Sequence, residues 1–463
     1  MISQTLLKQN QQTNADRSNY EQTFKQLAQA IQSQLSASEH FTLSLSSEES
    51  QFTRFNQAKV RQTGQVRDGR MYLSVMTDSH TIATTLPFTG DFAIDWPLTQ
   101  SILLRLQQDL PTLPVDPYIV LPAPAPTQNG TSREIRGGSL LAAAEIADRL
   151  LHPVRSLDFS GLYAGGMSYR AYADSAQKLH WFETPSFTLD YSLFGTTNQA
   201  VKGTVAGSSW NEEAYHQNIF ETRKRLELLS RPVKRVPRGS YRTYLAPAAV
   251  SELVETIMWG GIGEAALRQG NSAFKQLEQG EATLSEKFSL CENFDKIAIP
   301  RFNDRGEISP SQIPIVEGGR WANSLVSSRS AKEYGKCSNA ANGREAMRAP
   351  IVAAGNLPTA QILSQLGTGL YLSNLHYLNW SDLNAGRITG MTRYACFWVE
   401  EGEIVAPIEN LRFDDDLYRF LGEGLIDLTE QQTFIPSVGT YGRRSLGGMW
   451  MPGMLIDQFR YTL

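Results

Sequence analysis

Residues 366–413 read LGTGLYLSNLHYLNWSDLNAGRITGMTRYACFWVEEGEIVAPIENLRF, and this stretch decides the fold of the C-terminal half. Its core, residues 393–400, is rich in aromatic and β-favouring side chains. The pair Glu401-Gly402 separates this core from a second apolar run at residues 404–408. Two such runs joined by a short, glycine-containing connection are typical of a β-hairpin. Because a hairpin of this apolar density must be buried, we expect it at the centre of a C-terminal domain dominated by antiparallel β-sheet.

The chain upstream of this stretch has the pattern of smaller α/β units. Helical spacing of apolar residues is found at 18–36, 139–151 and 212–229, and strand-like runs are found at 41–45 and 52–55. We therefore predict an α+β protein, with N-terminal α/β units followed by the antiparallel C-terminal domain. The predicted divisions are an N-terminal α/β domain at 1–108, a Pro-rich linker at 109–137, a central α+β domain at 138–236 and a C-terminal β-rich domain at 237–463.

The composition is that of a soluble globular protein, with 41% hydrophobic and 19% charged residues. The net charge of -4 and the lack of a long basic run argue against a nucleic-acid partner. Charged, polar, Gly and Pro residues interrupt every apolar stretch, which argues against a membrane span. The first residues lack the apolar region of a signal peptide, and the widely spaced Cys291, Cys337 and Cys396 suit a reducing compartment. We therefore expect a cytoplasmic protein without a membrane partner.

Local motifs for catalysis or metal binding are missing from the sequence. The six histidines are scattered, and neither an HExxH motif nor a G-x-S-x-G nucleophile turn occurs. His376 has the pattern of a hydrogen-bonded histidine within a sheet, and Cys396 that of a packing residue in a buried strand. The three aspartates at 414–416 have the charge to gather a cation, although such a run more commonly forms a solvated turn.

A series of short motifs carries a family resemblance. The C-terminal ones are NLHY at 374–377, GRITGMTR at 386–393, FWVE at 397–400, EIVAPI at 403–408 and RF at 412–413. Weaker matches upstream are FTRFNQAKV at 52–60 and the turn NDRG at 303–306. Together they resemble the TldD/PmbA family, the paired subunits of a bacterial and archaeal metallopeptidase once described as modulators of DNA gyrase. The resemblance covers nearly the whole chain and is strongest in its last quarter.

The resemblance also indicates where this chain departs from the catalytic members. TldD-type subunits carry HExxxH on a helix, with two zinc ligands, and a cysteine near the C-terminus. The matching positions here are Val254, Glu255 and Trp259, on a helix predicted to start at Pro247, and Tyr441 in place of the cysteine. Valine and tryptophan have no lone pair to donate to zinc, and an isolated tyrosine is a poor ligand. The resemblance therefore implies the metal-free TldE/PmbA type, with no metal and no catalytic residue in this chain.

Three functions are compatible with the sequence. We favour a non-catalytic subunit that forms a heterodimer with a TldD-type subunit, which holds the zinc, and that helps enclose unfolded peptide. Its C-terminal sheet then pairs with a substrate strand through the backbone, and His376 and Arg393 are candidate substrate-binding residues. The first alternative is an autonomous peptidase or hydrolase with a non-standard site built from Glu255, His376 and the aspartates at 414–416. The second is a peptide-binding scaffold that forms a homodimer.

Overall fold

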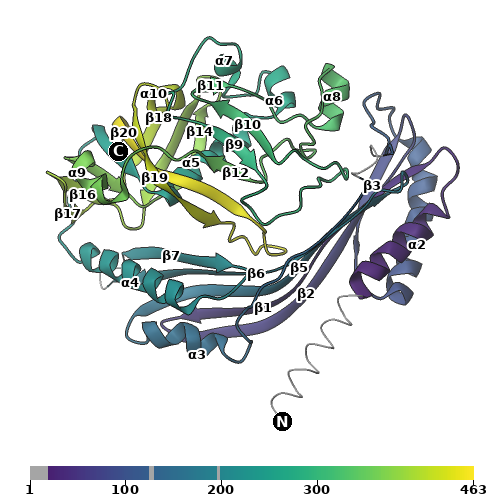
Figure 1. Cartoon of the computed structure of the whole chain (residues 1–463), viewed down its shortest axis with the longest axis horizontal. Helices are drawn as coiled ribbons and strands as arrows, with labels where there is room; N and C mark the ends of the chain where they lie inside the picture. The colour runs from purple at the N-terminus through teal and green to yellow at the C-terminus, as the bar shows by residue number, and fades with distance from the viewer. Residues whose placement is uncertain (1–18, 125–129, 196–198, 463) are drawn as a thin grey trace.

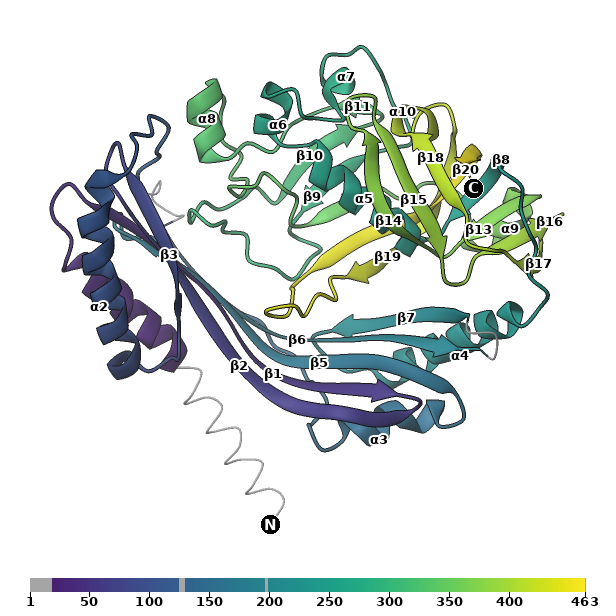
Figure 2. The same ribbon diagram turned by 180° about the vertical axis from the view of Figure 1, so that it is seen from behind.

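The computed structural model describes residues 19–124, 130–195 and 199–462, and within them the chain forms two β-sheets. A long, curved N-terminal sheet wraps around one side of the molecule, and the C-terminal part of the chain lies on its concave side (Figure 1). Helices cover the opposite face of the N-terminal sheet (Figure 2). The fold is α+β with mainly antiparallel sheets, as predicted. Among the described residues, no helix combines the length and apolar composition needed to cross a membrane.

Long antiparallel strands build most of the N-terminal sheet. Its strands are β1 (His40–Asn56), β2 (Lys59–Met76), β3 (Thr81–Pro87), β4 (Thr131–Ile135), β5 (Asp158–Asp174), β6 (Leu179–Phe194) and β7 (Ala200–Gly207). They follow the order β3-β2-β1-β5-β6-β4, and β7 also pairs with β6. The runs predicted at 41–45 and 52–55 are one strand, because the β1–β5 ladder continues from Thr42 to Phe55. This ladder joins the first and third predicted divisions of the chain in one sheet, and the domain limits stay predictions.

The helices of the N-terminal half match the predicted pattern in part, and α2 (Phe92–Asp109) was not predicted. They comprise helical residues 19–32, α2, α3 (Ile146–Leu151), α4 (Glu212–Leu229) and the 3-10 turns η1 (Leu110–Thr112) and η2 (His152–Val154). The helix predicted at 212–229 is confirmed as α4. The helix predicted at 139–151 is wrong in its first part, because α3 begins only at Ile146. Ser139 instead bonds through its backbone to Ser209 and Trp210, which holds the segment extended.

In the long strands β1, β5 and β6, odd- and even-numbered side chains point to opposite faces of the N-terminal sheet. Odd-numbered residues such as Leu43, Tyr169 and Leu189 lie in the apolar clusters beneath the helices. Even-numbered residues such as Glu48 and Ser168 face the C-terminal part, where arginine side chains contact them. Alternating side chains point to opposite faces of a strand, so one polar and one apolar face result. The polar face is nevertheless covered, since the C-terminal part packs onto it (Figure 1).

The C-terminal sheet is larger and is built from shorter strands. They are β8 (Gly239–Leu245), β9 (Leu290–Asn293), β10 (Gln312–Glu317), β11 (Arg320–Trp321), β12 (Pro350–Val352), β13 (Gly369–Leu372), β14 (Asn374–Asp382), β15 (Arg387–Arg393), β16 (Phe397–Glu400), β17 (Glu403–Pro407), β18 (Arg412–Asp416), β19 (Leu425–Pro436) and β20 (Gly448–Tyr461). Its helical elements are α5 (Pro247–Gly260), α6 (Glu264–Arg268), α7 (Lys275–Glu278), α8 (Ser328–Tyr334), η3 (Thr359–Gln361), α9 (Ile362–Leu366) and α10 (Leu417–Phe420). β20 lies at its centre and pairs with β8, β12, β18 and β19.

The predicted hairpin exists, but its first strand is shorter than the predicted run 393–400, since β16 begins only at Phe397, and its predicted position is wrong. β16 and β17 pair across Glu401 and Gly402, which both have positive φ, 50° and 83°. The pair nevertheless ends the strand order β20-β8-β13-β16-β17, so the hairpin forms an edge and not the centre of the sheet. Its apolar side chains are buried by helices instead: Val399 packs with Leu366 at the end of α9, and Phe397 packs with Leu229 of α4.

A short segment between β19 and β20 fastens the two halves together. The guanidinium of Arg444 is 5% exposed and donates to Glu48 Oε2 at 3.1 Å, and also to Ser50 and Ser168 of the N-terminal sheet. Next to it, Arg443 donates to Asp68 and Ser46. Buried charges are stable only when they are paired and hydrogen-bonded, and here the partner charges come from opposite halves. These contacts therefore set how the C-terminal part sits on the sheet.

Candidate functional site

Helix α5 carries three of the positions at which the resemblance implies a lost metal site. Pro247 occupies the first turn, where its fixed φ favours helix initiation. One face of the helix is buried in the large C-terminal core, and Val254 on that face is 1% exposed. Glu255 is exposed, and the Trp259 side chain is 71% exposed. The side chains at 254 and 259 therefore lie in opposite environments.

These positions do not fit a zinc ion. Val254 offers no donor atom, and the indole nitrogen of Trp259 donates a hydrogen bond but does not accept a metal. Tyr441 lies in the connection between β19 and β20 with its side chain fully exposed. In the described ranges, no group of three or more His, Cys, Asp or Glu side chains is arranged to hold a metal. We therefore derive no chemical step through a metal from the residues of this chain.

His376 and Arg393 lie together, in a cavity of about 450 Å³ between the two halves of the molecule. The N-terminal sheet contributes the end of β6 and the start of β7, and the C-terminal sheet contributes β14 and the end of β15 (Figure 2). The lining residues are Ser192, Phe194, Gln199, Ala200, His376, Tyr377, Met391, Thr392, Arg393, Tyr394, Ile408 and Asn410. The size is typical of a small-molecule or peptide-side-chain site.

The charged side chain among the described lining residues of this cavity is that of Arg393, a cation. Burial, Arg393 and Lys202 together lower the pKa of His376 below its usual value of 6.5. Lys202 Nζ is paired with Asp190 Oδ2 at 3.2 Å, whereas Arg393 takes part in no ion pair within the part of the chain that the structure describes. No Asp or Glu is among the described lining residues. His376 therefore has no carboxylate to orient it as a general base.

Two aromatic residues of the cavity adopt a backbone conformation that is unusual for large side chains. Tyr377 has φ 52° at an irregularity in the β14–β15 ladder, and Tyr394 has φ 62° just after β15. The Tyr377 ring lies 3.8 Å from the His376 ring between centroids, and the Arg393 guanidinium lies 4.9 Å from the centre of the Tyr394 ring. The thiol of buried Cys396 donates to the Arg393 carbonyl at 3.2 Å and holds this bend. Such strained positions concentrate at functional sites.

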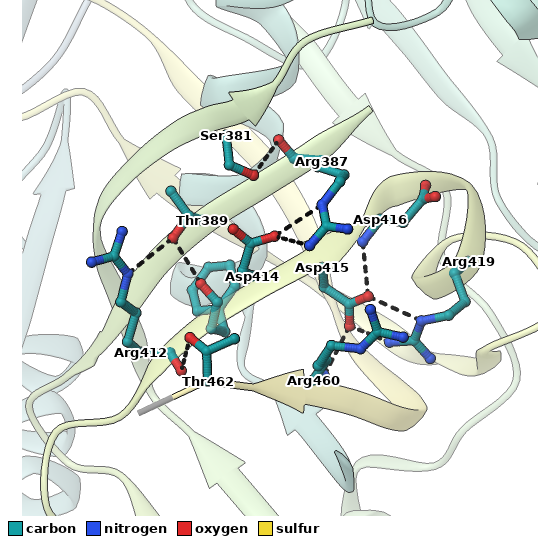
Figure 3. A network of polar contacts seen from close by, with 11 residues as sticks. Ser381, Arg387, Thr389, Arg412, Asp414, Asp415, Asp416, Arg419, Arg460 and Thr462 are labelled. Atoms are coloured by element: carbon teal, nitrogen blue, oxygen red, sulfur yellow. Dashed lines mark hydrogen bonds and ion pairs between the residues drawn. The ribbon is translucent and has the colours of Figure 1, made fainter. Parts of the chain in front are cut away.

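The aspartate run at 414–416 is neither a cation site nor a solvated turn. It forms the end of β18, and the carboxylates of Asp414 and Asp415 contact arginine side chains (Figure 3). Asp414 Oδ1 accepts from Arg387 Nη2 at 2.6 Å, and the fully buried Asp415 is paired with Arg419. Asp416 caps α10 by accepting a backbone N–H at 2.8 Å. None of the three lines the cavity of His376, so the structure does not assemble the alternative hydrolase site.

Sequence reasoning identified part of the cavity and missed the rest. It named His376 and Arg393, which the structure brings together through the β14–β15 ladder. It did not name Tyr377 and Tyr394, because positive φ at a tyrosine has no signal in a single sequence. It also missed Lys202 of β7, which is not one of the lining residues but whose charge helps to lower the pKa of His376. The local clue available was the density of aromatic residues beside His376 and Arg393.

Comparison with known proteins supports the resemblance read from the motifs. Residues 238–462 match the family profile described as the PmbA/TldA metallopeptidase C-terminal domain. The structure of TldE from Thermococcus kodakarensis is similar with a TM-score of 0.76 at 10% identity, covering 95% of this chain and 100% of that one. A putative modulator of a DNA gyrase from Thermotoga maritima is similar with a TM-score of 0.71 at 12% identity, covering 96% and 100%.

A third similar structure is a putative modulator of DNA gyrase from Bacteroides thetaiotaomicron. Its TM-score is 0.73 at 14% identity, and the match covers 95% of this chain and 98% of that one. At these identities the likeness shows the fold over nearly the whole length. No curated protein matches the sequence.

Proposed function

Since the chain belongs to the PmbA/TldA metallopeptidase family through the C-terminal domain at residues 238–462, we propose that it is a non-catalytic subunit of a peptide-processing complex. In this proposal it forms a heterodimer with a TldD-type subunit, which supplies the zinc and the hydrolytic chemistry. In this proposal the chain contributes its curved sheet (Figure 1), the cavity between its two halves and a surface that contacts the partner. The TldE name of one similar structure favours this subunit type.

The observation that carries the proposal is the environment of Val254. The resemblance puts a zinc-binding histidine at this position, yet the valine is 1% exposed and packs into the largest apolar cluster. An imidazole there has no room to reach a metal without disrupting that core, and burial of an unpaired polar ring is costly. Glu255 beside it then has no metal-bound water to activate, so it acts as a surface residue of α5.

The contacts of His376 favour a subunit over an autonomous hydrolase. A hydrolase built on His376 needs a partner carboxylate or a nucleophile within hydrogen-bond reach. The described residues around His376 that influence its pKa are Arg393 and Lys202, both cationic. A homodimeric scaffold stays the second alternative. It differs from the subunit proposal in that it does not bind a TldD-type chain.

The test combines a metal assay with reconstitution. The purified chain alone is expected to hold no stoichiometric zinc and to cleave no unfolded peptide. Co-expressed with the TldD-type subunit of the same organism, it is expected to co-purify in a fixed ratio and to give chelator-sensitive cleavage. Glu255→Gln in this chain is the matched variant, and it is expected to leave the cleavage rate of the complex unchanged.

Each alternative has its own outcome in this experiment. One zinc per isolated chain, with cleavage lost on addition of a chelator, would overturn the subunit proposal in favour of an autonomous enzyme. A stable homodimer that never captures a TldD-type chain would overturn it in favour of the scaffold. A tenfold loss of complex activity in Glu255→Gln would show that this carboxylate takes part in the chemistry.

A further inference from the structure

The cavity between the two sheets holds a cation without an internal counterion. In the described ranges the Arg393 guanidinium lies against the Tyr394 ring at 4.9 Å and forms no ion pair. Lys202 lies nearby but is not a lining residue, and the carboxylates of Asp190 and Glu252 offset its charge. No described lining residue is acidic. An arginine that faces a cavity in this state is free to bind a ligand oxyanion through charge-assisted hydrogen bonds.

The remaining lining suits an apolar group next to that anion. Phe194, Met391 and Ile408 provide apolar surface, and Ser192 and Asn410 provide neutral polar groups. The volume of about 450 Å³ lies in the range typical of small-molecule sites, so the cavity exceeds the needs of a bare inorganic anion. A ligand that fills it carries an anionic group together with a side chain.

The two tyrosines of the cavity are presented differently by the fold. The Tyr377 ring is 76% exposed and its ring contact is with His376, at 3.8 Å between centroids, so most of its surface is open to a ligand. On the other side, the carbonyl of Tyr394 accepts from the Cys396 backbone at 2.9 Å, and the Cys396 thiol holds the Arg393 carbonyl. Tyrosine rings provide large contact area at low entropic cost when a ligand binds, because they have only two side-chain torsions.

We propose that this cavity binds the C-terminal end of a peptide, with Arg393 contacting the terminal carboxylate and Tyr377 contacting the last side chain. The proposal rests on the proposed function only in naming a peptide as the source of the carboxylate. It assigns to this chain a recognition role that a partner's metal site does not provide. The end of the peptide then lies between the N-terminal sheet and β14–β15 (Figure 2).

The test measures peptide binding to the full isolated chain by fluorescence anisotropy. The probe is a short unstructured peptide ending in leucine, with a neutral fluorophore at its N-terminus, prepared as the free acid and as the C-terminal amide. The free acid is expected to bind about tenfold more tightly, since one charge-assisted hydrogen bond to arginine is lost in the amide. Inorganic phosphate is added in a parallel titration as a competitor without a side chain.

Matched arginine variants connect the preference to the cavity. Arg393→Gln is expected to reduce the acid-over-amide preference to about onefold. Arg235→Gln, at a side chain that is 89% exposed and paired with the exposed Glu409, is the control and is expected to keep the preference. Circular dichroism verifies that both variants fold, and if Arg393→Gln does not, the acid and amide comparison on the unaltered chain still decides. Tyr377→Gly is expected to weaken both peptides equally.

Several outcomes overturn the proposal. Equal binding of acid and amide peptides overturns it, as does an unchanged preference in Arg393→Gln. Displacement by phosphate together with equal peptide binding indicates a site for free anions only. This inference and the proposed function fail in different experiments. If the chain binds acid and amide peptides equally but still captures its partner and supports cleavage, only the carboxylate site is rejected. Peptide binding without partner capture rejects the subunit role and leaves the site.

Discussion

Replacement of Arg444 by methionine is expected to destabilise the chain by about 3–5 kcal/mol, the cost of breaking a buried ion pair from one side. The side chains of Arg444 and Glu48 are each 5% exposed, and their atoms Nε and Oε2 are 3.1 Å apart. The same guanidinium donates to the Ser186 carbonyl at 2.8 Å and to the Gly166 carbonyl at 3.1 Å. Methionine fills much of the volume but leaves the carboxylate and both carbonyls without these donors.

The measurement is urea-induced unfolding followed by circular dichroism. Arg235→Met is the control, because Arg235 and Glu409 are 89% and 56% exposed and such a surface pair contributes about 0–1 kcal/mol. Adding Glu48→Gln to Arg444→Met is expected to recover part of the loss, since it removes the buried negative charge. A cost below about 1 kcal/mol for Arg444→Met, equal to that of the control, would refute the reasoning that this cation fastens the two halves.

Three further predictions follow from strain, burial and charge. Tyr377→Gly is expected to leave the free energy of unfolding unchanged or raise it by about 1 kcal/mol in the same assay, because glycine adopts φ 52° freely. A loss of about 2 kcal/mol would contradict backbone strain at this residue. A thiol reagent is expected to modify the exposed Cys337 in the native chain but Cys396 only after unfolding, since Cys396 is buried and burial raises the pKa of its thiol. Mass spectrometry measures the two rates of modification, and equal rates in the native chain would count against this. Burial alone raises the pKa of Glu264, but the hydrogen bond from Ser324 and nearby cations lower it below 4.5. Its stabilisation is therefore complete above pH 4.5 and is lost as the pH falls through the folded-state pKa, so Glu264→Gln is expected to reduce the loss of stability on acidification.

Elements with strong local periodicity were predictable from the sequence. The helix at 212–229 and the helix starting at Pro247 are found as predicted, because a stripe of apolar residues at helical spacing needs only one buried face. The β16–β17 hairpin was predictable from its turn, Glu401-Gly402. Both residues have positive φ there, a conformation that glycine favours in a tight connection. The helix predicted at 139–151 failed where backbone bonds from Ser139 to a distant segment replaced helical ones.

The sequence by itself determined the helices with strong apolar periodicity, the family resemblance and the lack of zinc donors at 254, 259 and 441, because these depend on residue identity and local spacing. Only the tertiary structure decided that the β16–β17 hairpin forms an edge, since strand order depends on pairing between segments far apart in the chain. It also decided that Asp415 is fully buried against Arg419 and that Ser192 and Ala200 of the N-terminal sheet line one cavity with His376 and Arg393. The physical reason is that electrostatic partners and cavities form where separate elements pack, and no local sequence pattern encodes that packing.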